Sequence, residues 1–414
     1  MKKTQLELIG ILGKKIFNTS EVSVSENYGE DELQEIMLEA KQQAVYPLVF
    51  DCMKNVLKDK LSAERYIEYE TLQYAYIASS LRNKQSHYNI HRLLTDNAIP
   101  YVILKGLVSA MYYPELVLRD MGDVDFLVRK SDAARVDELL DQEGYEKKAD
   151  TENHSFHWEY EKDRRTVEMH WDVPGLPGKD DPGVRKYVSD VMESGRLVQL
   201  EDGEFYSPSD FHHGLILLLH TLGHLTSSGI GLRHLFDWLV FENSLSETEF
   251  TELFEGPLKE IGLWKFAQVL TKTGIIYCGC AKRGWCENTD PDLCTAFMED
   301  VLAGGNFGRK DKTRINQTKL IRNNTSRKIT DGHVVSNIIN NFNIKLKKEY
   351  PGIYRYKILH PAGWIMISSR YCFYLMLGKR VNLFSRQNYR SAMARQHLYS
   401  ELKVFEPESA KSQN

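Results

Sequence analysis

Three carboxylates stand at positions where they could hold a metal ion. Asp123 and Asp125 are separated by one residue at the start of a predicted strand, so their side chains project on the same side of the backbone. Two unpaired carboxylates this close repel each other, and Mg²⁺ removes the repulsion while it binds substrate phosphate oxygens. Glu168, on a later predicted strand, could ligate the metal or accept a proton from an attacking hydroxyl. These residue types indicate phosphoryl chemistry.

A short segment before the acidic pair adds candidate phosphate ligands. An apolar strand stops at Lys105 and Gly106 and gives way to a predicted helix over residues 107–113. At such a turn, exposed backbone N–H groups and the helix dipole favour an anion. Ser109 and Arg119 add further donors. The phosphates of a bound nucleotide are therefore expected between this turn and the two aspartates.

The segment that carries Glu168 is predicted to be the second strand of an antiparallel hairpin. Residues 155–161 and 165–173 are both rich in strand-forming residues, and a turn-like segment separates them. In the second strand the side chains alternate between two faces: Val167, Met169 and Trp171 on one, and Glu168, His170 and Asp172 on the other. One face is expected to pack and the other to line a cleft, which makes His170 a candidate substrate contact.

Several other polar residues recur at helical spacing. His213, His220 and His224 share one face of a predicted helix and could bind zinc, but neither an HExxH motif nor a nearby acidic ligand accompanies them. Packing against the catalytic sheet is the favoured interpretation, with His220 and His224 kept as candidate substrate contacts. Arg233 and Asp237, one helical turn apart, are expected to form an ion pair.

Composition narrows the class of protein. The 53 basic and 57 acidic residues give a net charge of −4, so the chain lacks the positive charge that would hold a polynucleotide, and nucleic acid is an unlikely partner. The sequence has neither an apolar run of about 18 residues nor a signal-like start, which predicts a cytoplasmic protein without a transmembrane segment. Six cysteines are too few for a disulfide scaffold.

Some features of the second half leave alternatives open. The four cysteines between Cys278 and Cys294 lack paired zinc-ligand spacing and are expected to be small buried or surface residues, although metal binding stays open. The basic segment 309–328 is expected to be a solvated loop, with closure over a substrate as the alternative. Residues 364–377 are expected to form a buried helix, with a membrane-surface helix as the alternative.

The motifs resemble a known family. The resemblance rests on Ile103-Leu104-Lys105-Gly106, Tyr113-Pro114, residues 119–128 and Val167-Glu168-Met169-His170-Trp171, and it extends to His220, His224 and the segments 233–237, 304–308 and 361–364. These are similar to the bacterial uncharacterised nucleotidyltransferases of the polymerase β-like superfamily. The resemblance implies that Asp123 and Asp125 bind metal and that Glu168 is the third acid. Lys105-Gly106 departs from the superfamily's Gly-Gly or Gly-Ser signature.

Together these observations predict an α+β protein. A small mixed β-sheet in residues 98–175 is expected to carry the catalytic core, between a helical N-terminal unit, 1–97, and a mostly helical C-terminal unit, 176–414, that forms the other wall of the cleft. The expected reaction uses Mg²⁺ (or Mn²⁺) to move a nucleoside monophosphate from an NTP to a small-molecule, sugar or peptide acceptor, with release of pyrophosphate. Phosphoryl transfer and nucleotide binding without turnover are the alternatives, and retention of all three acids argues against the latter.

Overall fold

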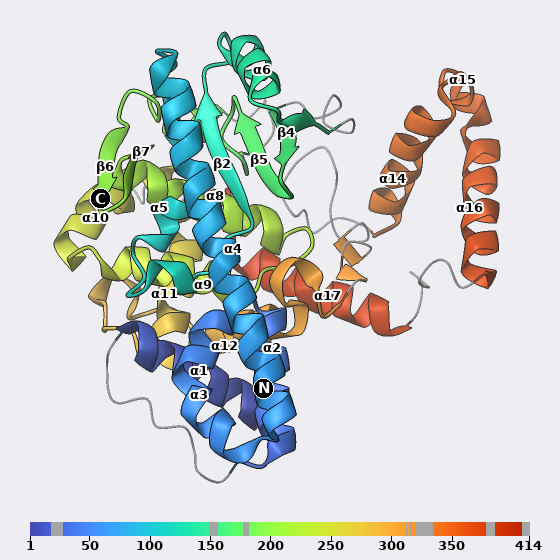
Figure 1. The fold of residues 1–414 in the computed structure, drawn as a ribbon. Helices are drawn as coiled ribbons and strands as arrows, with labels where there is room; N and C mark the ends of the chain where they lie inside the picture. Colours follow the sequence, from blue (N-terminus) through green and yellow to red (C-terminus); the bar gives the residue numbers. More distant parts are fainter. Residues whose placement is uncertain are drawn as a thin grey trace, which may run out of the picture.

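The fold is α+β, as predicted, with a small mixed sheet between two helical regions (Figure 1). The computed structural model describes residues 1–17, 28–148, 156–176, 182–311, 313–314, 317–318, 334–377 and 386–407. Among its helices, none in these ranges has both the length and the apolar character needed to cross a membrane. The division of the chain at residues 97 and 175 stays a prediction.

The main sheet has five strands in the order β1-β2-β5-β4-β3. Its strands are β1 (Tyr101–Ile103), β2 (Asp123–Val128), β3 (Glu146–Lys147), β4 (His157–Lys162) and β5 (Arg165–His170). The pairing of β2 with β5 is parallel, and the other pairings are antiparallel. In the register of the parallel pair, Asp125 lies opposite Glu168. The sheet therefore brings together acids that are far apart in the sequence.

The predicted hairpin is confirmed as β4 and β5. Its two turn residues, Asp163 and Arg164, have positive φ values of 51° and 59°, as in the tight turns that match strand twist. Val167 and Met169 are fully buried, which confirms the alternation of packed and polar faces. Strand β5 ends at His170, earlier than predicted, and the predicted start of the first strand at Ser155 lies outside the described residues.

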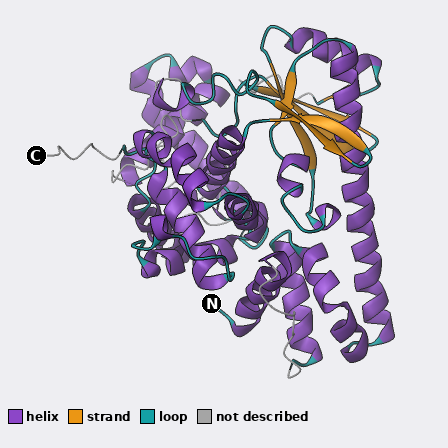
Figure 2. Ribbon diagram, turned by 90° about the vertical axis from the view of Figure 1, so that its left-hand side faces the viewer, coloured by secondary structure: helices purple, strands orange, loops and turns teal. Residues whose placement is uncertain are grey.

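Helices cover one face of the sheet. The first helical region contains α1 (Lys3–Phe17), α2 (Glu30–Gln42), α3 (Tyr46–Lys60) and α4 (Ala63–Asp96). Helix α4 is 34 residues long, begins after a cap in which Ser62 accepts from the Arg65 N–H, and runs from the other N-terminal helices to the sheet (Figures 1 and 2). Its Ile90 and Leu94 join the sheet core, together with residues of α6 (Ala133–Gln142). The opposite face carries the acids.

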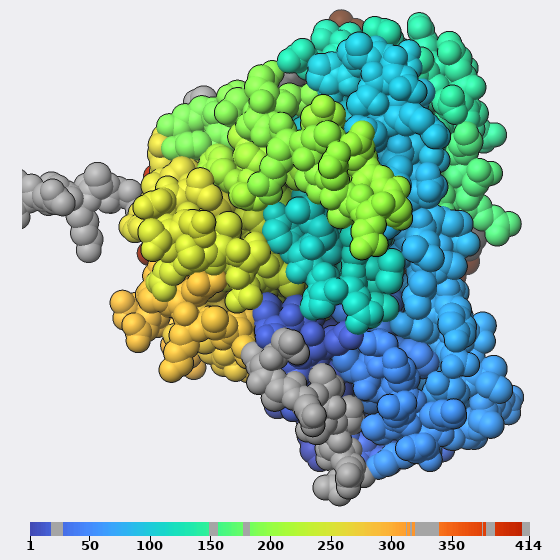
Figure 3. All heavy atoms as spheres, turned by 60° about the vertical axis from the view of Figure 1, so that its left-hand side comes forward, coloured from blue at the N-terminus to red at the C-terminus, as the bar shows by residue number. Residues whose placement is uncertain are grey.

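A larger set of helices follows the sheet. These elements are α7 (Pro182–Arg185), the hairpin of β6 (Arg196–Leu200) and β7 (Gly203–Ser207), α8 (Asp210–Leu225), α9 (Leu232–Asn243), α10 (Glu247–Glu260), α11 (Trp264–Tyr277), α12 (Pro291–Gly304) and α17 (Arg386–Glu401). Contacts between α1 and α11 join the two helical regions, which lie side by side in Figure 3. The four cysteines from Cys278 to Cys294 are buried free thiols.

Residues 364–377 were predicted to form a buried helix: the helix is present, but it is largely exposed. Helix α16 (His360–Met376) forms, but Ile365 is 68% exposed and Met376 is 79% exposed. It packs on α14 (Val334–Glu349), which stands beside it at one side of the molecule, with the short α15 (Pro351–Tyr354) between them (Figure 1). An apolar run predicts a helix, but its burial depends on a partner surface, and here only the side toward α14 is covered.

The predicted basic loop 309–328 lies largely outside the described residues. Of the residues that are described, Arg314 is 3% exposed and forms an ion pair with Asp300 of α12. This arginine is part of the packed structure and differs in that respect from the solvated loop that the charge run predicts.

Candidate active site

The parallel pairing of β2 and β5 forms an acidic cluster with a histidine in it. Asp125 is fully buried, and its Oδ1 lies 3.1 Å from the Nε2 atom of His170. The same Nε2 lies 3.4 Å from Oε2 of Glu168. One ligand atom from each of Asp125, Glu168 and His170 lies within 4.8 Å of the others. Asp123, two residues before Asp125, is partly exposed.

Lys105 completes the surroundings of Asp125. Its Nζ lies 3.0 Å from Oδ2 of Asp125, so the two carboxylate oxygens face one cationic group and one imidazole. Burial by itself would raise the pKa of Asp125, but Lys105 and His170 outweigh it and hold the pKa well below its usual range. Burial lowers the pKa of Lys105, and the three nearby carboxylates reverse that effect and raise it. The pair is therefore ionised.

For the other two acids, Asp123 and Glu168, the effects that raise the pKa are larger than those that lower it. Burial and the charge of Asp125 raise the pKa of Asp123, and burial and the same charge raise the pKa of Glu168. The nearby positive charge of Lys105 lowers both pKa values but does not outweigh these two effects. The close cluster offers two carboxylates, Asp125 and Glu168, and the imidazole of His170, and the carboxylate of Asp123 is near enough to interact with both acids. Carboxylate oxygens are the donors that Mg²⁺ and Mn²⁺ prefer, so the residues present fit a divalent ion.

The turn at Gly106 depends on a histidine that the sequence did not indicate. Gly106 has a φ of 69°, and a Cβ atom there would lie 2.8 Å from Nε2 of His87, so a larger residue is excluded. His87, on α4, accepts from the Leu107 N–H at 3.4 Å, and its Nδ1 donates to the Asn83 carbonyl. Burial lowers the pKa of His87 to about 4, which keeps the ring neutral.

The helix after this turn is shorter than predicted, and phosphate binding by Lys105, Gly106 and Ser109 stays a prediction. Helix α5 spans only Leu107–Ala110, shorter than the predicted 107–113, and its first N–H is bonded to His87. Ser109 is fully buried in α5, and its hydroxyl has no hydrogen-bond partner among the described residues. A helix of four residues has only a small dipole, so the positive charge at this turn comes mainly from the Lys105 side chain, which lines the pocket described next.

A pocket opens next to Asp123, between the sheet and the second helical region. It is lined by Lys105, Gly106, Arg119, Asp120, Met121, Gly122, Asp123, Leu217, His220, Thr221, Arg233, His234, Asp237, Asn306, Phe307 and Arg309. The first seven come from the sheet side, and the rest come from α8, α9 and the segment after α12. The expectation that the later helices form the other wall is confirmed.

Arg119 holds the two walls together. Its guanidinium is buried and donates to both carboxylate oxygens of Asp237 on α9 and to the Gly106 carbonyl. The predicted ion pair between Arg233 and Asp237 is therefore replaced by one between Arg119 and Asp237. A residue one helical turn away is a possible partner, but the buried guanidinium across the interface is the one that meets the carboxylate. Contact of Arg119 with phosphate stays a prediction.

Two further residues bring positive charge to the pocket: Arg233, for which an ion pair with Asp237 was predicted, and Arg309, the first residue of the predicted basic segment. Arg233 donates to the Asp120 carbonyl at 3.0 Å, and its guanidinium lies 5.5 Å from the ring centre of Phe307. Arg309 follows on an exposed position after the helix α12. Phe307 has a positive φ of 54° between Gly305 and Gly308, whose φ values are also positive. In the sequence, the glycines of residues 304–308 were the feature that could have predicted a turn with positive φ values here.

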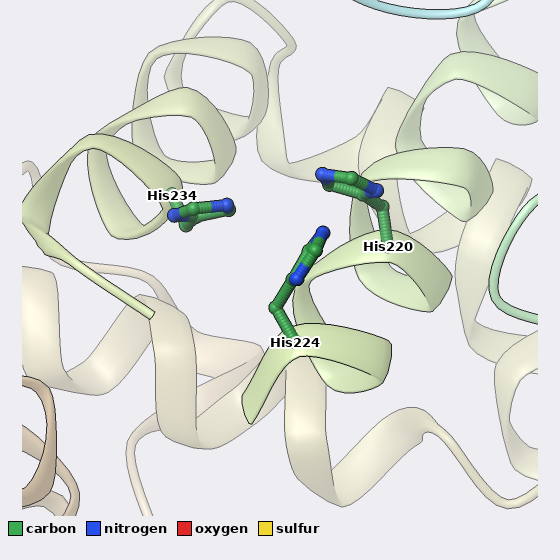
Figure 4. Close-up of side chains that lie close together, drawn as sticks. All are labelled: His220, His224 and His234. Carbon is green, nitrogen blue, oxygen red and sulfur yellow. The ribbon is translucent and has the colours of Figure 1, made fainter. Parts of the chain in front are cut away.

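The histidines of α8 separate into two environments. His213 is fully buried and stacks on Tyr112 with ring centres 5.5 Å apart, away from the other two. His220 and His224 instead meet His234 of α9, as Figure 4 shows. The prediction grouped His213 with His220 and His224, and this is wrong for His213. The third ring beside them is that of His234, because α9 packs against α8 at His220.

A known protein family covers the part of the chain that forms the sheet and the first two helices of the opposite wall. The family model described as "Uncharacterised nucleotidyltransferase" matches residues 30–273. Comparison with curated proteins gives no match. The segments 304–308 and 361–364 lie outside the matched range, so the resemblance stated for them stays a prediction.

Proposed function

Since the chain belongs to this nucleotidyltransferase family, we propose that it moves a nucleoside monophosphate from an NTP to an acceptor hydroxyl or phosphate and releases pyrophosphate. The observation that carries the proposal is the composition of the pocket. Asp123, at the edge of the acidic cluster, lines it together with the cationic side chains of Lys105, Arg233 and Arg309. Binding of a nucleoside triphosphate for transfer requires both kinds of group: carboxylates that hold the metal ion, and cations that contact the phosphate oxygens.

The acids are proposed to hold the metal. Asp123, Asp125 and Glu168 would bind Mg²⁺ (or Mn²⁺), which neutralises charge on the transferred phosphoryl group and aligns the attacking and leaving oxygens when bound. Lys105 already touches Asp125 and reaches the pocket, so its ammonium group can contact both the acid and a phosphate oxygen. His170 is 2% exposed and lies behind Asp125, so we propose that it positions the acids and does not contact the substrate.

Glu168 is proposed to accept the proton of the acceptor. Its side chain is 22% exposed, whereas that of Asp125 is 1% exposed, so it is the more accessible of the two paired acids. Burial and the charge of Asp125 raise its pKa, and a raised pKa makes a carboxylate a better base. The acceptor proposed from the family resemblance is a small molecule, a sugar or a peptide. Phe307, exposed at the pocket, offers a ring against which a base or sugar can pack.

Labelled nucleotides distinguish this proposal from its alternatives. The purified protein is incubated with Mg²⁺, a fractionated cell extract and NTP labelled at either the α- or the γ-phosphorus. Nucleotidyl transfer places the α-label on the acceptor and releases pyrophosphate. Release of NDP with transfer of the γ-label would establish phosphoryl transfer instead, and nucleotide binding without any product would favour a regulatory protein. The Asp123→Asn variant is the control for contaminating activities.

A further inference from the structure

Three histidine rings from two helices meet at the side of the pocket. His220 and His224 lie one turn apart on α8, and His234 faces them from α9. The ring centres of His220 and His224 are 4.4 Å apart, and those of His220 and His234 are 5.7 Å apart. One nitrogen from each ring lies within 4.8 Å of the other two. In Figure 4 the three rings point toward a shared space.

Packing alone does not account for His234. The residue is 3% exposed, and neither ring nitrogen has a hydrogen-bond partner among the described residues. A neutral imidazole has one N–H donor and one lone pair, and an unsatisfied buried polar group costs about 1–3 kcal/mol. An apolar residue would fill the same position between His220 and the ring of Phe307 without that cost. The unused lone pair on the His234 ring therefore points to a bound electron-pair acceptor such as a metal ion.

The packing around the rings holds them in place. His234 lies between the rings of His220 and Phe307 and is 3% exposed. Phe307 lies edge-on to two of the rings, with centres 4.6 Å from His224 and 5.2 Å from His234, and limits the access of solvent on that side.

We propose that His220, His224 and His234 bind a transition-metal dication of the zinc class. Three imidazoles are a ligand set that suits Zn²⁺ and leaves a fourth tetrahedral position for an outside ligand. Because His220 and His234 line the pocket with Lys105 and Arg233, that ligand is an anionic oxygen, from hydroxide or from a substrate phosphate. The site is separate from the acidic cluster, whose carboxylates suit Mg²⁺.

The test uses the metal alone, without nucleotide. The full-length protein is stripped with a chelator and dialysed against Zn²⁺ in a large excess of Mg²⁺, and bound zinc is measured by mass spectrometry. We expect one tightly bound zinc per chain, and a loss of affinity of roughly tenfold or more in His220→Asn and in His234→Asn, because each removes one ligand. Co²⁺ bound at the site should give visible absorption bands that both variants lose.

Two matched controls locate the binding. His213→Phe changes a buried histidine of the same helix that stands outside the trio, and Asp125→Asn changes the acidic cluster; both should keep the zinc. Circular dichroism confirms that each variant is folded, and His220→Asn, at the more accessible position, serves if His234→Asn does not fold. Wild-type protein without bound zinc, or zinc that is lost in Asp125→Asn and kept in the histidine variants, would overturn the proposal. Neither result bears on nucleotidyl transfer.

Discussion

Arg119 and Asp237 stand 118 positions apart in the sequence and form a buried ion pair with two contacts. The Nε–Oδ1 and Nη2–Oδ2 distances are both 2.7 Å. The Tyr113 hydroxyl donates to the same Oδ1 at 2.9 Å, and Nη1 of Arg119 reaches the Gly106 carbonyl at 3.3 Å. The pair therefore ties α9 to the turn that carries Lys105, and it sets the relative position of the two pocket walls.

Removal of one partner of this pair should destabilise the whole protein. Asp237→Asn leaves the buried Arg119 guanidinium without a counter-charge, so we expect the free energy of unfolding to fall by about 3–5 kcal/mol. Chemical denaturation measures the change. The exposed ion pair of Arg129 and Glu193 supplies the control, since Glu193→Gln should cost at most about 1 kcal/mol. Equal losses in both variants would contradict a special role for the buried pair.

The variants Asp123→Ala and Asp125→Ala should differ in stability, although the proposed function requires both carboxylates for turnover. Asp125→Ala removes the partner of Lys105 and His170 inside the protein, and we expect a loss of about 3–5 kcal/mol without metal. Asp123→Ala removes a carboxylate whose pKa is raised by burial and by Asp125, so stability should be retained or increased. Thermal denaturation in a chelator and an activity assay measure the two effects. Activity in either variant would remove that residue from the proposed metal site.

Replacement of Lys105 should separate nucleotide binding from metal binding. Lys105→Met removes a cation from the pocket and should weaken NTP binding by roughly tenfold, a typical contribution of one charge-assisted contact. The same change removes a charge that competes for Asp125, so Mn²⁺ binding without nucleotide should not weaken. Calorimetry with NTP and electron paramagnetic resonance with Mn²⁺ make the comparison. Unchanged NTP affinity would assign Lys105 a structural role only.

Glu168→Gln should affect chemistry more than binding. The amide has nearly the shape of the carboxylate but is a far weaker base and metal ligand, so we expect the rate to fall by roughly 10²- to 10⁴-fold while NTP affinity changes little. Single-turnover kinetics and nucleotide titration measure the two quantities on the same protein. Normal turnover in the variant would show that Glu168 takes no part in the reaction.

His213 should make the protein less stable in acid. Burial lowers the pKa of His213 to about 4, so the native state keeps it neutral while the unfolded chain binds a proton below about 6.5. Stability is therefore complete above pH 6.5 and is lost as the pH falls toward 4, by roughly 3 kcal/mol from this residue. His213→Phe should reduce that loss in urea unfolding measured at several pH values. An unchanged loss of stability in that variant would assign the acid sensitivity to other residues.

The features that the sequence determined by itself are local. Alternation along residues 165–170 placed Glu168 and His170 on one face, because successive side chains of a strand point to opposite sides. The one-residue spacing placed Asp123 and Asp125 on the same side of β2, and the charged turn after β4 indicated the hairpin. Each of these follows from the geometry of a few neighbouring residues, so no knowledge of distant contacts was needed.

Other features were decided only by the tertiary structure. The parallel pairing of β2 with β5 sets Glu168 beside Asp125, and the packing of α9 on α8 brings His234 to His220. The same packing places Asp237 next to Arg119, so these two residues form the ion pair although Arg233 is nearer to Asp237 in the sequence. For α16, the apolar pattern predicted the helix and said nothing of whether a partner surface would cover it. These outcomes depend on contacts between segments that are distant in the sequence. The local pattern of residues does not determine the energies of such contacts.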